Sequence, residues 1–130
     1  FRRRAPHAPD LAELERARLD AFDAADTPAL GREALARVAP ERWAELRLRF
    51  APSLRLLRLA WPVDRLWAAS ERGEPAPEIA PTQRALCVWR RDERVLHRAA
   101  DALEAGCLAA LARETTTRRA AGSGRRRTSR

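Results

Sequence analysis

The sequence LRLRFAPSLRLLRLAWPVDRLW, residues 46–67, decides the fold because its hydrophobic pattern changes along its length. Over residues 46–50, leucine or phenylalanine occupies every second position and arginine occupies the positions between. A period of two is typical of a strand with one buried and one solvent-facing side, so we predict a strand over residues 46–50. Pro52 cannot donate a hydrogen bond to a β-ladder and therefore marks a break or a sheet edge.

A second strand is predicted over residues 54–59, where leucine and arginine mix again. Leu54 and Leu56 keep the strand period, whereas Leu57 departs from it and indicates a bulge or a helical phase. A helix is then expected from Val63 to Ser70, because Pro62 suits the start of a helix. The stretch therefore predicts two strand segments followed by a helix.

The residues before this stretch predict helices. A helix is expected over residues 10–25, because Asp10 with a glutamate three residues later forms a variant of the capping box. Its core face is expected to consist of Leu11, Leu14, Ala17, Ala21, Phe22 and Ala25. A shorter helix is predicted over residues 30–38 and a helical turn over residues 40–43.

The residues after the stretch predict a hairpin and a last helix. A loop rich in proline and glycine covers residues 71–83. Residues 84–90 are apolar on both faces, which predicts a central strand, and residues 94–98 return as the next strand after a polar turn. The last helix begins at Asp101, and its core face is expected to consist of Leu103, Cys107 and Leu111, with Leu108 beside them. The predicted fold class is α+β, a small antiparallel sheet packed with helices.

A chain of 130 residues predicts one domain, which we place at residues 10–114. Residues 1–9 are expected to be a flexible N-terminal end, and the sequence contains no methionine, so we expect the chain to begin inside a longer protein. Residues 115–130 are expected to be a disordered basic tail. The formal net charge is +8, but the arginines of residues 2–4 and 115–130 more than account for it, so the domain itself is near neutral.

This distribution of charge bears on nucleic-acid binding. A folded DNA-binding domain usually carries a basic stripe on its own surface, whereas here the excess arginines lie at the two ends. Nucleic-acid binding therefore stays an alternative function, with the arginine-rich ends as its best support. A purely structural interaction domain is a further alternative.

No catalytic or metal-binding pattern is present in the sequence. His7 and His97 lie far apart and have no ligand or nucleophile pattern around them, and there is no glycine-rich phosphate loop. Cys87 and Cys107 lack the spacing of a metal site, so we expect reduced thiols in the core, with one structural disulfide as the alternative. We therefore expect a protein that is not an enzyme and has no catalytic residue, metal or cofactor. A cytoplasmic location is expected, because no apolar run approaches the ~18 residues of a membrane helix.

Residues 43–111 resemble the C-terminal part of a known bacterial family. The residues that carry the likeness are LRLRFAPSLRLL at 46–57, Trp61-Pro62-Val63 with Trp67, Val88-Trp89-Arg90, and the helix over residues 102–111. Members of this family have long been labelled DNA-binding. They are accessory subunits, of which the methanobactin-type partner protein is one kind, of multinuclear non-haem iron oxidases that modify ribosomally made peptides. The family more often has histidine where this chain has Ala51, so no role of that histidine is transferred.

The resemblance implies a non-catalytic protein that binds a precursor (leader) peptide and presents it to a partner iron oxidase subunit. The peptide is expected to add as a strand along residues 46–59 or 86–96, because a broken strand leaves backbone groups unpaired. Outward arginines could then pair with acidic residues of the leader. The candidate peptide-binding residues are Arg47, Arg49, Arg55, Arg58, Trp89 and Arg90. The alternative for the arginines is a solvated face neutralised by acids on nearby helices.

Overall fold

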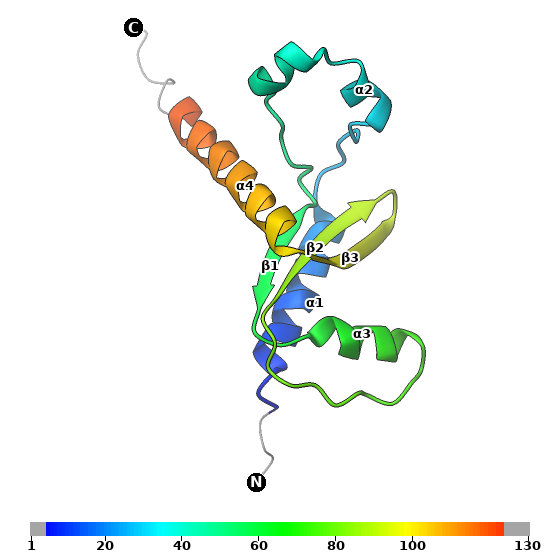
Figure 1. Cartoon of the computed structure of the whole chain (residues 1–130). Helices are drawn as coiled ribbons and strands as arrows, with labels where there is room; N and C mark the ends of the chain where they lie inside the picture. The colour runs from blue at the N-terminus through cyan, green and yellow to red at the C-terminus, as the bar shows by residue number, and fades with distance from the viewer. Residues whose placement is uncertain (1–4, 124–130) are drawn as a thin grey trace, which may run out of the picture.

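Three antiparallel strands form a sheet at the centre of the molecule (Figure 1). The strands are β1 (Arg55–Leu59), β2 (Arg84–Arg91) and β3 (Arg94–Ala100), and they lie in the order β1-β2-β3. The computed structural model describes the backbone of residues 5–123 and the side chains of residues 5–114. The α+β class and the central position of β2, both predicted from the sequence, are therefore confirmed.

The core lies between one face of this sheet and helix α1 (Ala8–Asp23). On β2, Leu86 and Val88 are fully buried, and Leu57 lies directly opposite Leu86 on β1. From α1, Leu14 enters the same cluster together with two alanines one and two turns further on, Ala17 and Ala21. The expected helical face is confirmed at these three positions. Phe22 was also expected on this face, but it is mostly exposed, because it follows Ala21 directly and so points off the buried side of the helix.

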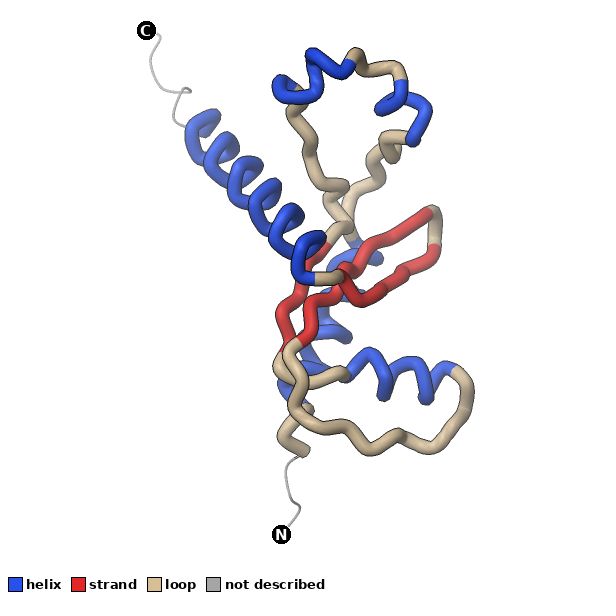
Figure 2. Tube along the Cα trace, viewed as in Figure 1, coloured by secondary structure: helices blue, strands red, loops and turns tan. Residues whose placement is uncertain are grey.

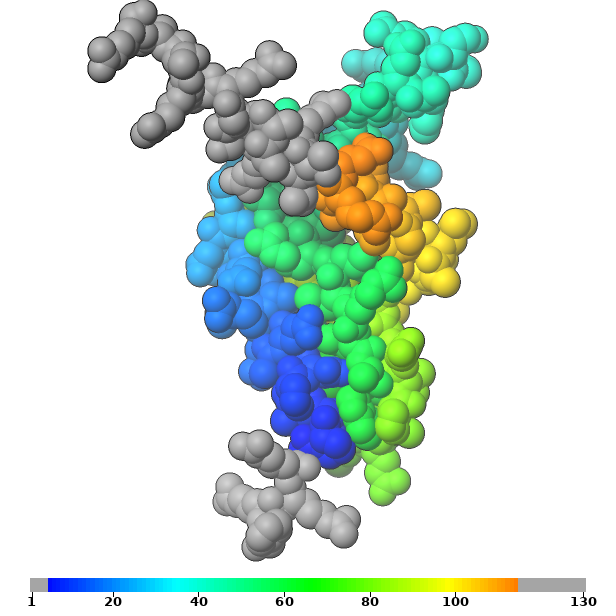
Figure 3. All heavy atoms as spheres, turned by 90° about the vertical axis from the view of Figure 1, so that its left-hand side faces the viewer, coloured from blue at the N-terminus to red at the C-terminus, as the bar shows by residue number. Residues whose placement is uncertain are grey.

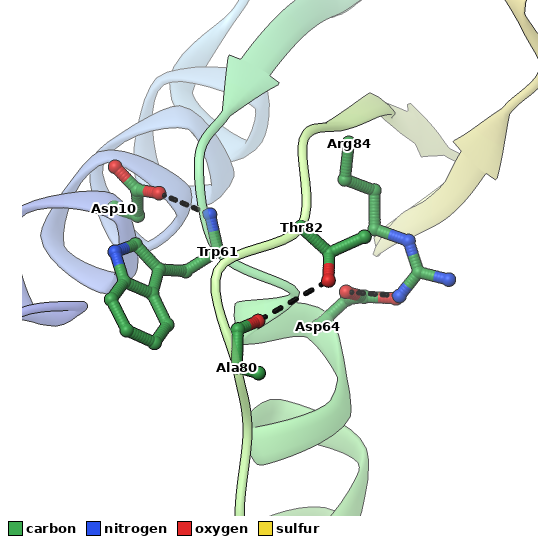
Figure 4. Close-up of polar contacts among 6 residues, drawn as sticks. All are labelled: Asp10, Trp61, Asp64, Ala80, Thr82 and Arg84. Carbon is green, nitrogen blue, oxygen red and sulfur yellow. Dashed lines mark hydrogen bonds and ion pairs between the residues drawn. The ribbon is translucent and has the colours of Figure 1, made fainter.

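The side chain of Asp10 ties the first turn of α1 to the end of β1 (Figure 4). Its Oδ2 atom accepts hydrogen bonds from the backbone N–H groups of Ala60 and Trp61, both at 2.8 Å. Asp10 was predicted to cap its own helix, but no side-chain cap is present there. The carboxylate instead satisfies two backbone donors that the sheet leaves without a partner.

Residues 24–54 form a long excursion that leaves the end of α1 and joins the sheet at the start of β1 (Figure 2). The excursion contains helix α2 (Arg32–Ala36) and the 3-10 helix η1 (Pro40–Glu45), and neither buries a residue. Several of its large apolar side chains, among them Leu30, Trp43 and Leu48, are exposed. Its elements contribute nothing to the core of the described residues.

The predicted strand over residues 46–50 is wrong, because this segment is the irregular return leg of the excursion. The register explains why. Residue 53 stands opposite Arg90 and residue 52 opposite Arg91, the last residue of β2, so residues before 52 have no strand to pair with. The alternation of leucine and arginine was therefore a pattern without a neighbouring strand. The second predicted strand, by contrast, is confirmed as β1.

Helix α3 (Val63–Glu71) confirms its predicted start, and helix α4 (Ala102–Ser123) confirms the last helix but not its core face. Leu103 and Cys107 are exposed, and Ala105 is the buried residue instead. The reason is that α4 touches the sheet with its first turns and then points away from it (Figure 1). Cys87 is a buried free thiol, as expected.

Helix α4 also continues past Glu114, where the sequence analysis placed the start of a disordered tail. A helix that has already nucleated extends at little cost, which explains its continuation to Ser123. Residues 124–130, and residues 1–4 of the predicted N-terminal end, lie outside the described residues.

The side chain of Arg18 connects α1, α3 and β3. Its guanidinium donates to His97 Nδ1 at 2.7 Å and to the carbonyl oxygen of Val95 at 3.2 Å, and it lies 4.5 Å from the ring centroid of Trp67. Because an arginine in a protein stays protonated, His97 Nδ1 must be the acceptor and its ring proton must be on Nε2. Neutral His97 is therefore part of the packing.

We expect this contact to make folding sensitive to acid. Burial and the charge of Arg18 lower the pKa of His97 below its ordinary value of 6.5, against the smaller opposite effects of Glu71 and Asp64. Since the lowered pKa belongs to the folded state, the stabilisation is complete above about pH 6.5 and is lost as the pH falls below it. Melting temperature should therefore fall between about pH 7 and about pH 5.

The variant His97→Asn provides the control, because its amide oxygen can accept from Arg18 and does not titrate. Over the same pH range, the melting temperature of the wild-type protein should fall by more than that of this variant. Equal losses would show that carboxylates elsewhere cause the whole effect.

Candidate functional site

Strand β1 has a free edge, because only β2 pairs with it in the described part of the chain. Antiparallel strands alternate between residue pairs that exchange both backbone hydrogen bonds and pairs that exchange none. The N–H of Arg90 points toward the β1 side, since it donates to Ser53 Oγ at 3.2 Å. By the same alternation, Leu86 and Val88 bond to β1, and the backbone groups of Leu56 and Arg58 point outward. These outward groups could pair with a fourth strand.

The opposite edge of the sheet, on β3, is partly blocked. On β3, Arg94 and Leu96 lie opposite Arg91 and Trp89 and bond to β2, by the same alternation. The backbone groups of Val95, which lies between them, therefore point away from β2. Arg18 already donates to this oxygen. Of the two sheet edges, β1 is therefore the one whose outward backbone groups have no partner among the described residues.

The free edge is short and lies at the surface. Figure 3, which looks onto the left-hand side of Figure 1, shows the green atoms around β1 exposed between the blue atoms of α1 and the orange atoms of α4. At the far end of β1, the N–H groups of Ala60 and Trp61 are already used by Asp10. The open backbone is thus the segment around Leu56 and Arg58.

Two of the six predicted binding residues, Arg55 and Arg90, lie on the face of the sheet that α1 covers. Arg90 donates to the carbonyl oxygen of Phe22 and forms an ion pair with Asp26, so it holds the base of the excursion. Arg55 donates to the carbonyl oxygens of Pro52 and Leu54 and stabilises the turn before β1. Both side chains are engaged within the fold.

Arg58 and Trp89 lie on the opposite, more open face of the sheet. Side chains alternate between the two faces along a strand, and the neighbours Leu57 and Val88 face α1. Arg58 is exposed and has no partner among the described residues. Trp89 is half-buried, with the guanidinium of Arg98 at 6.0 Å from its ring centroid. The structure therefore does not bring the six residues together on one surface.

The other two, Arg47 and Arg49, are exposed on the return leg of the excursion, off the sheet. Neither has a partner among the residues whose side chains are described. They approach the start of β1 along the chain, so they flank the free edge rather than line it.

The open face around Arg58 carries one engaged ion pair. Arg98 binds Glu104 of α4 through two hydrogen bonds, and this bonding holds the pKa of the Glu104 carboxyl below its ordinary value. Glu104 thus stays ionised and neutralises Arg98. Beneath them, burial is the main cause that raises the pKa of the Cys87 thiol, which stays protonated and unreactive. Among the described side chains, none forms an ion pair with Arg58, although Asp101 lines the same groove.

Two open grooves lie near the sheet. A groove of about 1040 Å³ runs between the base of the excursion and the β2–β3 hairpin, and its lining includes Phe22, Ser53 and Arg90. A second groove, of about 810 Å³, lies beside Arg58 at the end of β1 and includes Ala85 and Ala100. The sequence analysis missed both grooves, because their walls come from segments far apart in the chain.

Sequence reasoning also missed Leu56, Ser53 and Asp10 as residues that shape the free edge. Pro52-Ser53 before a strand was the available signal for Ser53, since a serine at a strand end often bonds to a nearby backbone group. No local signal marks Leu56 or Asp10, because their roles depend on partners elsewhere in the chain.

The described residues contain no candidate metal site and no helix that could span a membrane. No group of three or more His, Cys, Asp or Glu side chains in the described part of the chain could hold a metal ion. None of the described helices is long and apolar enough to cross a membrane.

Comparison of the chain with protein-family models, with curated proteins and with solved structures gives no match. The likeness of residues 43–111 to the accessory-subunit family therefore stays a prediction. A function has to be argued from the geometry of the β1 edge.

Proposed function

We propose that this protein is a non-catalytic accessory protein that binds an extended precursor peptide along the free edge of β1 and presents it to a partner iron oxidase subunit. The observation that carries the proposal is the outward direction of the backbone groups of Leu56 and Arg58. An edge strand of this kind binds extended peptides by backbone pairing, with side-chain contacts adding specificity.

The charges around the edge support an acidic peptide. Arg58 lies beside the edge, and Arg47 and Arg49 lie on the return leg of the excursion that leads into β1; all three are exposed and have no partner among the described side chains. Paired arginines such as Arg55 and Arg90 have no part in the proposal, since their donors are used within the fold. The iron chemistry is assigned to the partner subunit, and this assignment rests on the family resemblance. The proposal places the protein in the cytoplasm, where free thiols are the rule.

We expect a synthetic peptide to reveal the pairing. The probe is Thr-Val-Thr-Glu-Thr-Val-Thr with blocked ends, which places a valine two residues on each side of the glutamate. In a ¹⁵N–¹H NMR titration, the amide signals of Leu56 and Arg58 should shift the most. The peptide is expected to pair antiparallel, as the strands of this sheet do. In an antiparallel pair, the peptide residues opposite Leu56 and Arg58 turn their backbone groups toward β1, so the glutamate and valine N–H groups should face β1.

Backbone methylation separates pairing from other modes of binding. N-methylation of the glutamate and one valine should abolish the shifts, whereas N-methylation of two threonines should leave them. Equal effects of both methylated peptides would contradict strand addition.

The variant Arg58→Pro gives the matching test on the protein. It removes one outward N–H, and proline is tolerated at such positions on edge strands. We expect it to weaken peptide binding at least about tenfold. Its control is Arg58→Thr, which also removes the charge but keeps the N–H, so the difference between the two variants measures the backbone contribution.

A further inference from the structure

We propose that the groove beside Arg58 is a subsite that selects one acidic side chain, and that Leu56 selects an apolar side chain two residues away in the bound segment. This inference rests on the proposed function, because it assumes a strand paired with β1. It names the class of peptide that the edge accepts: an extended segment with an acidic and an apolar residue separated by one residue.

The register of the free edge fixes which peptide side chains matter. Leu56 and Arg58 are the two residues whose backbone groups point outward, and their side chains share the open face. Residues directly opposite one another in neighbouring strands place their side chains on the same face. A paired peptide therefore sets one side chain beside Arg58 and, two residues along, another beside the half-buried Leu56.

The groove provides room at the first of these positions. Its floor next to Arg58 is formed by Ala85, directly opposite on β2, and Ala100, opposite Ala85 on β3. Alanines on both neighbouring strands leave an open volume of about 810 Å³ into which a side chain from outside the sheet can extend.

The charges that line the groove favour a carboxylate. Arg84 also lines it, but its guanidinium donates to Asp64 at 2.8 Å and is neutralised there. Among the described residues, Asp101 is the one acidic residue of the lining; its Oδ1 accepts from the Glu104 N–H at 2.8 Å, and it forms no ion pair with Arg58. Arg58 is the lining cation that has no partner among the described side chains. An acidic residue of the peptide would complete a charge-assisted hydrogen bond with it.

The test uses three peptides that differ only in the central residue of the probe: glutamate, glutamine or lysine. We expect the glutamine peptide to bind about three- to tenfold more weakly than the glutamate peptide, and the lysine peptide to bind more weakly still. The variant Arg58→Glu should reverse the order of the glutamate and lysine peptides. Replacing both valines by serine should also weaken binding, because it removes the apolar contact with Leu56.

The matched control is Arg94→Glu. Arg94 is another exposed arginine without a partner among the described residues, on the same face but at the hairpin, so this variant changes the net charge equally without touching the groove. It should leave the order of the three peptides unchanged. A reversal in both variants would show that only overall charge is sensed, and would overturn the subsite.

The two proposals fail in different ways. If the methylation pattern holds but the three peptides bind equally, the subsite is wrong and strand addition to β1 stands. If no peptide shifts the signals of β1, both the subsite and the proposed function are wrong.

Discussion

Replacing Leu86 by alanine should lower the free energy of unfolding by about 2–5 kcal/mol, the range for large-to-small changes in a packed core. Leu86 is 0% exposed and lies on the central strand. Because α1 and β1 pack around it, truncation of its side chain leaves a cavity that water does not reach. A chain of this size is stabilised by only about 5–15 kcal/mol, so the loss is a large share of the total. Urea denaturation followed by circular dichroism measures it.

The matched control is Leu103→Ala. Leu103 was predicted to lie in the core, but it is 78% exposed on α4. Its replacement should change the free energy of unfolding by less than about 0.5 kcal/mol, as surface substitutions usually do. A loss at Leu103 as large as that at Leu86 would mean that α4 folds back onto the domain.

The second large effect is expected at Asp10. Replacement by alanine removes a charged acceptor from the N–H groups of Ala60 and Trp61, and should lower the free energy of unfolding by about 2–3 kcal/mol. Hydrogen bonds to charged groups contribute more than neutral ones, and here a single oxygen serves two donors that follow β1 directly. The same denaturation experiment measures this loss.

Glu13→Ala is the control for Asp10, because Glu13 is an exposed acid in the same helix with no partner among the described residues. It should cost far less. The Asp10→Ala variant should also weaken peptide binding, since Asp10 holds the end of the strand that carries the free edge. Unchanged stability in Asp10→Ala would show that water replaces the carboxylate at both N–H groups.

The sequence predicted most of the fold correctly where a pattern depends on burial along one element. The apolar character of both faces of residues 84–90 identified β2 as the central strand, because a strand covered on both sides needs apolar residues at consecutive positions. The spacing of Leu14, Ala17 and Ala21 likewise identified the buried face of α1.

The wrong predictions share a different cause. Residues 46–50 have the period of a strand, and Leu103 and Cys107 have the spacing of a helical core face, but both patterns lack a surface to pack against. Local periodicity says which residues could be buried together, whereas burial needs a second element at the right place. The end of β2 at Arg91 and the direction of α4 decide these cases.

The candidate site follows the same division. Residues 54–59 could be identified as a strand rich in arginine from their own pattern, because strand period and charge are local properties of the chain. That Arg58 has no partner among the described side chains while Arg90 is bound to Asp26 could not be foreseen, since a charge is neutralised by whatever residue the fold places beside it. The free edge of β1, the blocked edge of β3 and the groove beside Arg58 arise from contacts between segments far apart in sequence, and such contacts exist only in the folded chain.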